Sequence, residues 1–243
     1  MLGNDYIPEG RPKQVGLVVL QADETLEVEF RRLMPPELEY LVTRVPSPDT
    51  VSRESLRSME TALTEAAARL PRGAVFSAVG YGCTSASAEL GAARVHRLIQ
   101  DGADTPAVTE PLTAIVAACR ALGVLRPALV SPYVPEVALR LSDALERHDI
   151  HVSNAINFNE EVEVRVVRIP RSRIVEAAID VARASESDAV ILSCTNLRTL
   201  DTIVEIERVT GKPVVTSNQA LAWHLCQLSG VVHKPAIGGR LFS

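Results

Sequence analysis

Two cysteines, Cys83 and Cys194, follow similar apolar segments and could act together as catalytic thiols. Residues 74–82 and 188–193 are rich in apolar and small residues, and each cysteine is followed by threonine. Such a segment is typical of a parallel strand that leads into a helix, so we expect each thiol beside a helix amino terminus. The helix dipole and the free backbone N–H groups there favour the thiolate. Two thiols on opposite sides of a small substrate could add to, or deprotonate, one face of a carbon and deliver a proton to the other.

The two cysteine segments belong to a longer internal repeat. Pro, Thr, Cys, Gly and Val recur in the same order at a constant offset of 107 residues. The identical pairs are Pro106 and Pro213, Thr109 and Thr216, Cys119 and Cys226, Gly123 and Gly230, and Val124 and Val231. We therefore expect two homologous halves related by a pseudo-twofold axis, with the thiols on opposite sides of one cleft. The first subdomain is predicted to comprise residues 1–115 plus 216–243, and the second residues 116–215.

Short apolar runs alternate with helical periodicity along the chain, which predicts an α/β fold. Strands are expected at 15–20, 38–45, 74–79, near 107, and at 127–130, 150–156, 189–192 and 213–215. Helices are expected at 52–70, 86–100, 112–122, 135–147, 171–184, 200–209 and 218–228. This order is typical of parallel sheets with helices on both faces, and ligands bind outside the carboxyl ends of such strands.

Four loops at predicted strand ends converge on the expected cleft. They comprise residues 21–25, 82–85, 131–133 and 193–196. The polar residues directly after the two cysteines, together with exposed N–H groups, could hold substrate carboxylates and the enolate that forms when charge moves onto one of them. These candidate substrate-binding residues are Thr84, Ser85, Thr195 and Asn196.

Composition and charge argue against several classes of protein. The chain has 243 residues, 47% of them hydrophobic, and can therefore bury a sizeable core. A net charge of −5 without any Lys/Arg cluster argues against a nucleic acid partner. No apolar run approaches the ~20 residues of a membrane span, and residues 1–13 lack the apolar core of a signal peptide. We therefore expect the four cysteines to be reduced thiols in a cytoplasmic protein.

The sequence also argues against a metal or an organic cofactor. The five histidines are scattered without ligand spacing, and no lysine falls at a predicted strand end in the cleft, as a pyridoxal Schiff base would need. Gly80 and Gly82 precede a helix as in a dinucleotide-binding loop, but Ser85 stands in place of the third glycine. Cys119 and Cys226 lie in apolar helices and are expected in the core.

These residues resemble the aspartate/glutamate racemase superfamily, and within it the branch of maleate cis-trans isomerases and arylmalonate decarboxylases. The resemblance covers almost the whole chain. It rests on the paired cysteine segments and on residues 16–19, 131–133, 205–207, 211–215 and 239–242. It implies two flavodoxin-like subdomains, with no cofactor and no metal. Decarboxylases of this branch keep only the second cysteine, whereas isomerases and racemases keep both, as this chain does.

The isomerase pattern implies that Cys83 adds to the double bond of maleate and forms a covalent succinyl adduct, while Cys194 donates and accepts a proton on the other side. Tyr133 corresponds to the substrate-binding tyrosine of the family, and Asn159 lies near its second asparagine. The chain departs from the pattern at Asp23, because the isomerases carry an asparagine there that binds a substrate carboxylate. A carboxylate at this position would repel a dicarboxylate unless it is protonated, so a substrate with an ammonium or amide group suits Asp23 better.

Several functions remain open on the sequence alone. The favoured function is a cofactor-independent isomerase that acts on a small carboxylate substrate as a homo-oligomer, either a dimer or a tetramer. An amino-acid-type racemase is an alternative, because residues 20–25 also resemble the branch named for ectoine utilisation. An arylmalonate decarboxylase-like enzyme and a non-catalytic small-molecule-binding protein are open as well. Without a function, both thiols and Tyr133 would be core residues, and Asp23 and Glu24 would be solvated or would cap a helix.

Overall fold

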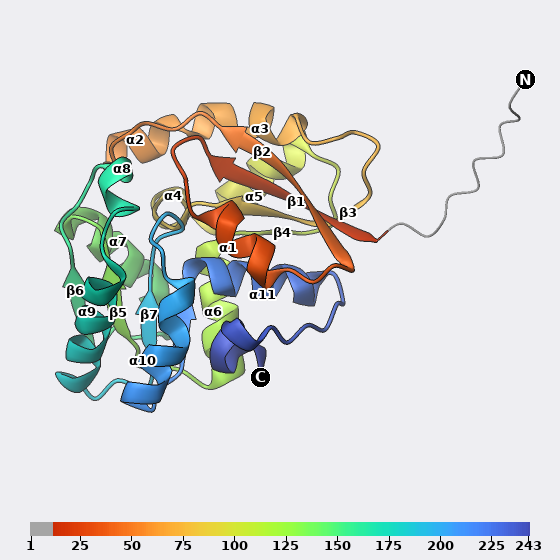
Figure 1. Cartoon of the computed structure of the whole chain (residues 1–243). Coiled ribbons are helices and arrows are strands. Elements are labelled where there is room, and N and C mark those ends of the chain that lie inside the picture. The colour runs from red at the N-terminus through yellow and green to blue at the C-terminus, as the bar shows by residue number, and fades with distance from the viewer. Residues whose placement is uncertain (1–11) are drawn as a thin grey trace, which may run out of the picture.

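The computed structural model describes residues 12–243 and contains two four-stranded parallel sheets (Figure 1). The first sheet has the order β2-β1-β3-β4. Its strands are β1 Lys13–Leu20, β2 Leu38–Val45, β3 Phe76–Gly82 and β4 Val108–Thr109. The second sheet has the order β6-β5-β7-β8. Its strands are β5 Ala128–Ser131, β6 Asn154–Asn157, β7 Val190–Leu192 and β8 Val214–Thr216.

The two sheets place equivalent strands in equivalent positions, which confirms the fold expected from the internal repeat. In each sheet the first strand in the chain pairs with the second on one side and with the third on the other. This is the flavodoxin-like order, and its ligand-binding point lies between the first and third strands, where the direction of the connections reverses. The loops that carry Asp23, Cys83, Tyr133 and Cys194 follow these strands. The fold therefore brings the four expected loops to the two switch points.

Apolar composition accounts for the central strands. Parallel sheets are covered on both faces, so their strands are apolar along their whole length. Leu17, Val18 and Val19 of β1 are fully buried, as are Val190, Ile191 and Leu192 of β7.

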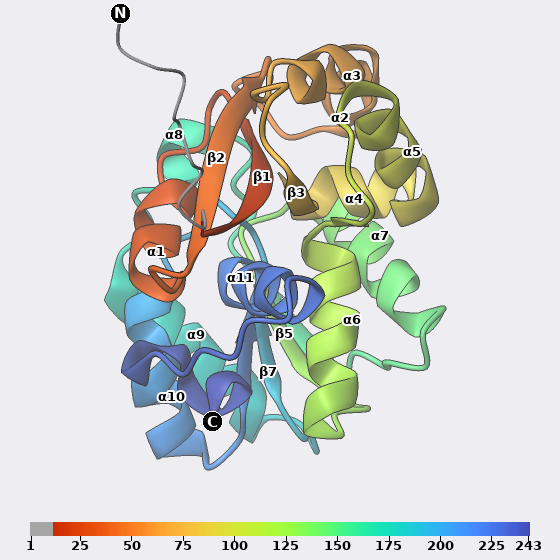
Figure 2. The same cartoon turned by 90° about the vertical axis from the view of Figure 1, so that its right-hand side faces the viewer.

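Helices cover both sheets. In the first half they are α1 Leu26–Leu33, α2 Arg53–Ser58, α3 Glu60–Ala68, α4 Thr84–Leu90, α5 Ala92–Gly102 and α6 Pro111–Leu122. In the second half they are α7 Pro135–Glu146, α8 Glu163–Val166, α9 Arg171–Arg183, η1 Leu200–Thr202, α10 Ile203–Thr210, α11 Ser217–Leu228 and η2 Ala236–Phe242. Helix α11 follows the second sheet in the chain but packs against β3 and α1 of the first half and beside α6 (Figure 2). The subdomain boundaries at residues 115 and 216 stay a prediction.

Several helices differ from the expected ones. The helix expected at 52–70 is two helices that meet at Met59, and the one expected at 86–100 begins at Thr84 and is interrupted at Gly91. Helices α1 and α8 and the segment η2 had no counterpart in the sequence-based assignment. The strand expected at 150–156 is the shorter β6, which begins only at Asn154.

Gly91 separates α4 from α5 with φ 85° and ψ 139°, a conformation that residues with a side chain rarely adopt. We expect Gly91→Ala to lower the free energy of unfolding by about 1–3 kcal/mol, because the added Cβ strains the backbone although it meets no atom within 4 Å. Gly73→Ala is the matched control, since its Cβ also meets no atom within 4 Å and its φ is not positive. Urea denaturation of both variants measures the difference, and equal stabilities would show that Gly91 carries no strain.

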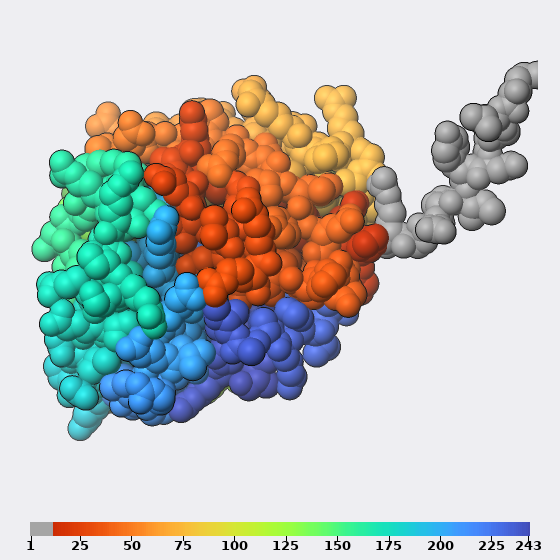
Figure 3. Space-filling model, viewed as in Figure 1, coloured from red at the N-terminus to blue at the C-terminus, as the bar shows by residue number. Residues whose placement is uncertain are grey.

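Within residues 12–243, no helix is long and apolar enough to cross a membrane. The segment expected to lack a signal peptide, residues 1–13, lies largely outside the described residues. In the space-filling view the residues of the first half, in red and orange, pack directly against the later residues in cyan and blue (Figure 3).

Candidate active site

Cys83 lies at the start of α4, directly after β3. Its Sγ accepts a hydrogen bond from the Ala86 N–H at 3.4 Å and lies 3.6 Å from the Ser85 Oγ. Cys83 is therefore the N-cap residue of α4, as expected from the sequence. The side chain is buried, with only 3% of the residue exposed.

Cys194 lies two residues beyond β7 and is held differently. It is followed by a turn rather than by a helix amino terminus, so the position expected beside a helix is wrong for this thiol. Its backbone has φ 140°, in a region that favours glycine and costs a residue with a side chain about 1–3 kcal/mol. The Cys194 N–H donates to the Ser217 Oγ at 3.1 Å, which helps to hold this conformation.

Hydrogen bonds between the halves join the two thiol loops. The Ser217 Oγ that accepts from the Cys194 N–H also lies 2.9 Å from the Thr84 Oγ1. The Thr195 hydroxyl donates to the Gly82 carbonyl at 3.2 Å. Gly82, which precedes Cys83, thus contacts Thr195, which follows Cys194. Ser217 links Thr84, which follows Cys83, to the backbone of Cys194. The structure brings both cysteines into one buried site.

Burial opposes the thiolate that the sequence led us to expect. Burial raises the pKa of Cys83 to about 11, although the Ala86 N–H and the Ser85 hydroxyl both lower it. Burial raises the pKa of Cys194 well above its ordinary value, and the negative charge of Glu163 raises it further. The expectation of readily ionised thiols is therefore not met in this buried site, because one helix amino terminus does not offset the loss of water around sulfur.

Tyr133 is buried beside both thiols. It is 2% exposed and follows β5. Burial, followed by the charges of Cys194 and Cys83, raises its phenolic pKa well above the ordinary value. Tyr133 therefore keeps its proton and is a hydrogen-bond donor in this site.

Asp23 is buried just before α1, and one of its two carboxyl oxygens binds the backbone there. Its Oδ1 accepts from the backbone N–H groups of Thr25 and Leu26 at 2.8 and 2.7 Å. Its Oδ2 is buried without a hydrogen-bond partner among the described residues. Burial raises the pKa of this carboxyl, and Thr195 lies close enough to lower it in part. Asp23 thus binds the backbone at the start of α1, whose N-cap residue is Thr25, and its role in the site stays a prediction.

Asn196 joins the Asp23 loop to a carboxyl that sequence reasoning missed. Its Nδ2 donates to the Glu163 Oε2 at 2.7 Å, and its Oδ1 accepts from the Glu24 N–H at 2.9 Å. Burial raises the pKa of Glu163 to about 7, Asn196 lowers it, and the charge of Asp23 raises it. Both polar atoms of the Asn196 side chain are therefore hydrogen-bonded within the protein. Glu163 is a further carboxyl near the thiols.

Asn159 is not part of this group. It is exposed and lies in the irregular segment after β6, with φ 56°. The only sequence signal for Glu163 is an acidic residue between two valines, and this pattern occurs on many solvated surfaces.

Glu29 supports the Cys194 loop from the first half. Its Oε1 accepts from the backbone N–H groups of Thr199 and Leu200, both at 2.9 Å. Its Oε2 accepts from the Asn218 Nδ2 at 2.8 Å, and the same Nδ2 donates to the Thr195 carbonyl at 2.8 Å. Neither Glu29 nor Asn218 was a candidate from the sequence.

We expect Glu29 to make the protein less stable as the pH rises. Burial raises its pKa from 4.5 to about 7, so between these values the folded state holds a proton that the unfolded state has lost. The free energy of unfolding then falls with pH, by on the order of 2–3 kcal/mol for this group. Glu29→Gln should flatten the profile, although Glu163 contributes in the same direction.

Urea denaturation at about pH 5 and about pH 8 measures this slope. Glu176→Gln is the control, because its side chain is 57% exposed. A Glu29→Gln profile parallel to that of the unaltered protein would contradict the expectation.

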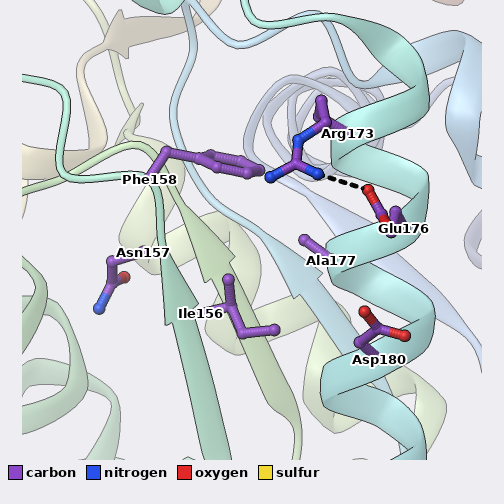
Figure 4. Close-up of a pocket in the computed structure, with 7 residues that line it drawn as sticks. All are labelled: Ile156, Asn157, Phe158, Arg173, Glu176, Ala177 and Asp180. Carbon is purple, nitrogen blue, oxygen red and sulfur yellow. Dashed lines mark hydrogen bonds and ion pairs between the residues drawn. The ribbon is translucent and has the colours of Figure 1, made fainter.

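A separate cavity of about 360 Å³ lies between β6 and α9 (Figure 4). It is lined by Ile156, Asn157, Phe158, Arg173, Glu176, Ala177 and Asp180. None of the candidate site residues lines it, and Arg173 pairs there with Glu176 at 2.8 Å. Within residues 12–243 no three His, Cys, Asp or Glu side chains are grouped as a metal site.

Comparison with known proteins identifies relatives over nearly the whole chain. The family model described as arylmalonate decarboxylase matches residues 15–242. The arylmalonate decarboxylase of Bordetella bronchiseptica is 30% identical over 94% of this chain and 95% of its own length. The maleate isomerase of Nocardia farcinica is 28% identical over 88% of each protein.

A solved structure of a relative shows a covalent intermediate. It is a cysteine-to-serine variant of the Nocardia farcinica maleate cis-trans isomerase with a bound succinylcysteine intermediate. Its TM-score is 0.81 at 25% identity, and the match covers 95% of this chain and 98% of that chain.

Proposed function

Because the chain belongs to the arylmalonate decarboxylase family, we propose that it is a cofactor-independent isomerase in which Cys83 and Cys194 act together on a small carboxylate substrate. One observation carries the proposal. Two thiols are buried in adjoining loops from the two halves, joined through Ser217 and Thr195. Decarboxylation needs a proton delivered to one face of a carbanion, and one thiol suffices for it. A second thiol serves a reaction that both adds to a carbon and exchanges a proton at its neighbour.

The reaction begins with an attack by Cys83 on a double bond conjugated to a carboxylate. The Cys83 thiolate forms an S–C bond, and the π electrons of the double bond move to the adjacent carbon and onto its carboxylate as an enolate. Cys194 gives its proton to that carbon and is left as the thiolate. The product of this half-reaction is a saturated thioether, whose central C–C bond is single and free to rotate.

The second half-reaction reverses the first from the rotated geometry. The Cys194 thiolate takes back the proton, the double bond re-forms, and the S–C bond breaks to release the Cys83 thiolate. Protons and electrons balance over the cycle without a cofactor. The Ala86 N–H and the Ser85 hydroxyl favour the Cys83 thiolate at both ends of the cycle, because each lowers the pKa of this thiol.

The remaining side chains hold the substrate. Tyr133 keeps its proton and can donate to a carboxylate or to the enolate. The Ser85 hydroxyl lies 3.6 Å from the attacking sulfur, and the Thr84 hydroxyl lies 2.9 Å from that of Ser217. Substrate entry requires the site to open, since both thiols and Tyr133 are at most 6% exposed.

Incubation of the purified protein with a panel of cis-butenedioate, its monoamide and (Z)-4-aminobut-2-enoate, and separately with phenylmalonate as an arylmalonate, tests the proposal. Proton NMR follows conversion to the trans isomer, and intact-protein mass spectrometry detects a thioether adduct on Cys83. Cis-trans conversion of any of these compounds, together with the adduct, is the expected result. Decarboxylation of an arylmalonate without isomerisation of any panel member would overturn the proposal, and so would the lack of both conversion and adduct across the panel.

A further inference from the structure

Two buried carboxyls, Asp23 and Glu163, lie near the thiols. They are 3% and 6% exposed, and neither takes part in an ion pair among the described residues. The N–H groups of Arg44 donate to the backbone carbonyls of Leu20, Gln21 and Asp23 and to the Glu27 carboxylate. The charge of Arg44 lowers the pKa of Asp23, but its guanidinium binds these carbonyls and Glu27 rather than the Asp23 carboxyl.

One oxygen of these two carboxyls, the Asp23 Oδ2, lacks a hydrogen-bond donor among the described residues. The Asp23 Oδ1 accepts two backbone N–H groups, whereas its Oδ2 is buried and has no hydrogen-bond partner among the described residues, although the Thr195 side chain lies near enough to lower the pKa of this carboxyl. Leaving a buried carboxylate oxygen without a donor is costly, so such an atom points to a ligand that supplies the missing hydrogen. Glu163 accepts from Asn196, which also receives the Glu24 N–H beside Asp23, so one side chain links the two acidic segments.

The negative charges of both carboxyls act on the pKa values of the thiols. Glu163 and Asp23 each raise the pKa of Cys194, and Glu163 also raises that of Cys83. A dianionic substrate would add two further negative charges to this group. A substrate with a positive charge would instead offset the repulsion and complete the hydrogen bonding of Asp23.

We propose that Asp23 and Glu163 bind a protonated amino group of the substrate, so that the enzyme acts on an unsaturated amino-carboxylate rather than on a dicarboxylate. This inference rests on the isomerase function proposed above. The ammonium group donates to the free Asp23 Oδ2 and lies beside the Glu163 carboxyl, while the single carboxylate is conjugated to the double bond that Cys83 attacks. By offsetting the two negative charges, the bound substrate favours ionisation of the thiols that act on it.

Kinetics with matched substrates test the inference. The ratio of kcat/KM for (Z)-4-aminobut-2-enoate to that for cis-butenedioate is measured for the unaltered protein and for Asp23→Asn and Glu163→Gln. We expect the unaltered protein to favour the amino-carboxylate, and each variant to lower the ratio about tenfold through the loss of one charge contact with the ammonium. Both substitutions keep an oxygen acceptor for Thr25, Leu26 or Asn196, so the fold is preserved. Glu24→Gln is the matched control, because this neighbouring acidic residue is exposed.

Binding of unreactive analogues separates this inference from the proposed reaction. Calorimetry compares 4-aminobutanoate with succinate, neither of which has a double bond for Cys83 to attack. Tighter binding of 4-aminobutanoate, lost in Asp23→Asn or Glu163→Gln, supports the ammonium site even if no substrate is isomerised. Tighter binding of succinate would overturn the ammonium site even if isomerisation is observed. If a variant does not fold, the preference of the unaltered protein between the two analogues decides the question.

Discussion

Serine in place of Cys83 is expected to lower kcat/KM at least ~10³-fold and to abolish the covalent adduct, on the scale of losing an activated nucleophile. A serine hydroxyl is a much weaker acid than a thiol and would not ionise in a site that already raises the pKa of Cys83 to about 11. The fold should persist, because a serine Oγ is a suitable acceptor for the Ala86 N–H that now donates to sulfur. Proton NMR of the isomerisation and intact-protein mass spectrometry give the two readouts.

Cys119→Ser is the control for this prediction. Cys119 is fully buried in α6, and burial raises its pKa to about 12, so the substitution places a hydroxyl in the core without touching the site. It should lower the melting temperature while leaving kcat/KM within a few-fold of the unaltered protein. Near-normal turnover by Cys83→Ser would exclude the covalent route.

The positions of the two thiols could be predicted because a duplicated pattern carries three-dimensional information. Equivalent strands of two homologous halves occupy equivalent places in their sheets, so the loops after β3 and β7 had to lie at corresponding switch points. The apolar strands were identified for a similar reason, because burial on both faces leaves a continuous apolar run. The boundaries of the helices were less predictable. The apolar spacing continues through Gly91, although the backbone there breaks the helix.

The chemistry around the thiols depended on packing that the sequence does not reveal. Ser217 and Glu163 reach the site through hydrogen bonds to Cys194 and Asn196, residues that lie 23 and 33 positions away in the chain. Asn159 is only four residues before Glu163 but is exposed. The raised pKa values of the thiols also could not be anticipated. Helix capping at Cys83 depends on nearby residues, whereas its burial depends on how the two halves pack together.

Cys194→Ser is expected to stop the reaction at the covalent adduct rather than before it. Cys83 remains able to attack, and water can supply the proton to the enolate in one slow step. A serine hydroxyl is then too weak a base to remove that proton, so the thioether cannot eliminate. We expect turnover to fall at least ~10²-fold, which is the usual contribution of a positioned proton-transfer group.

The distinguishing measurement is the mass of the protein after incubation with substrate. Cys194→Ser should gain the mass of one substrate molecule, and peptide mapping should locate it on Cys83, whereas Cys83→Ser should gain none. Cys226→Ser is the matched control, since Cys226 is buried in α11 outside the site and should allow normal turnover without a trapped adduct. An adduct located on Cys194 in Cys83→Ser would show that Cys194, rather than Cys83, is the nucleophile. Normal turnover by Cys194→Ser would show that one thiol suffices, and the second cysteine would then be a core residue despite its position beside the first.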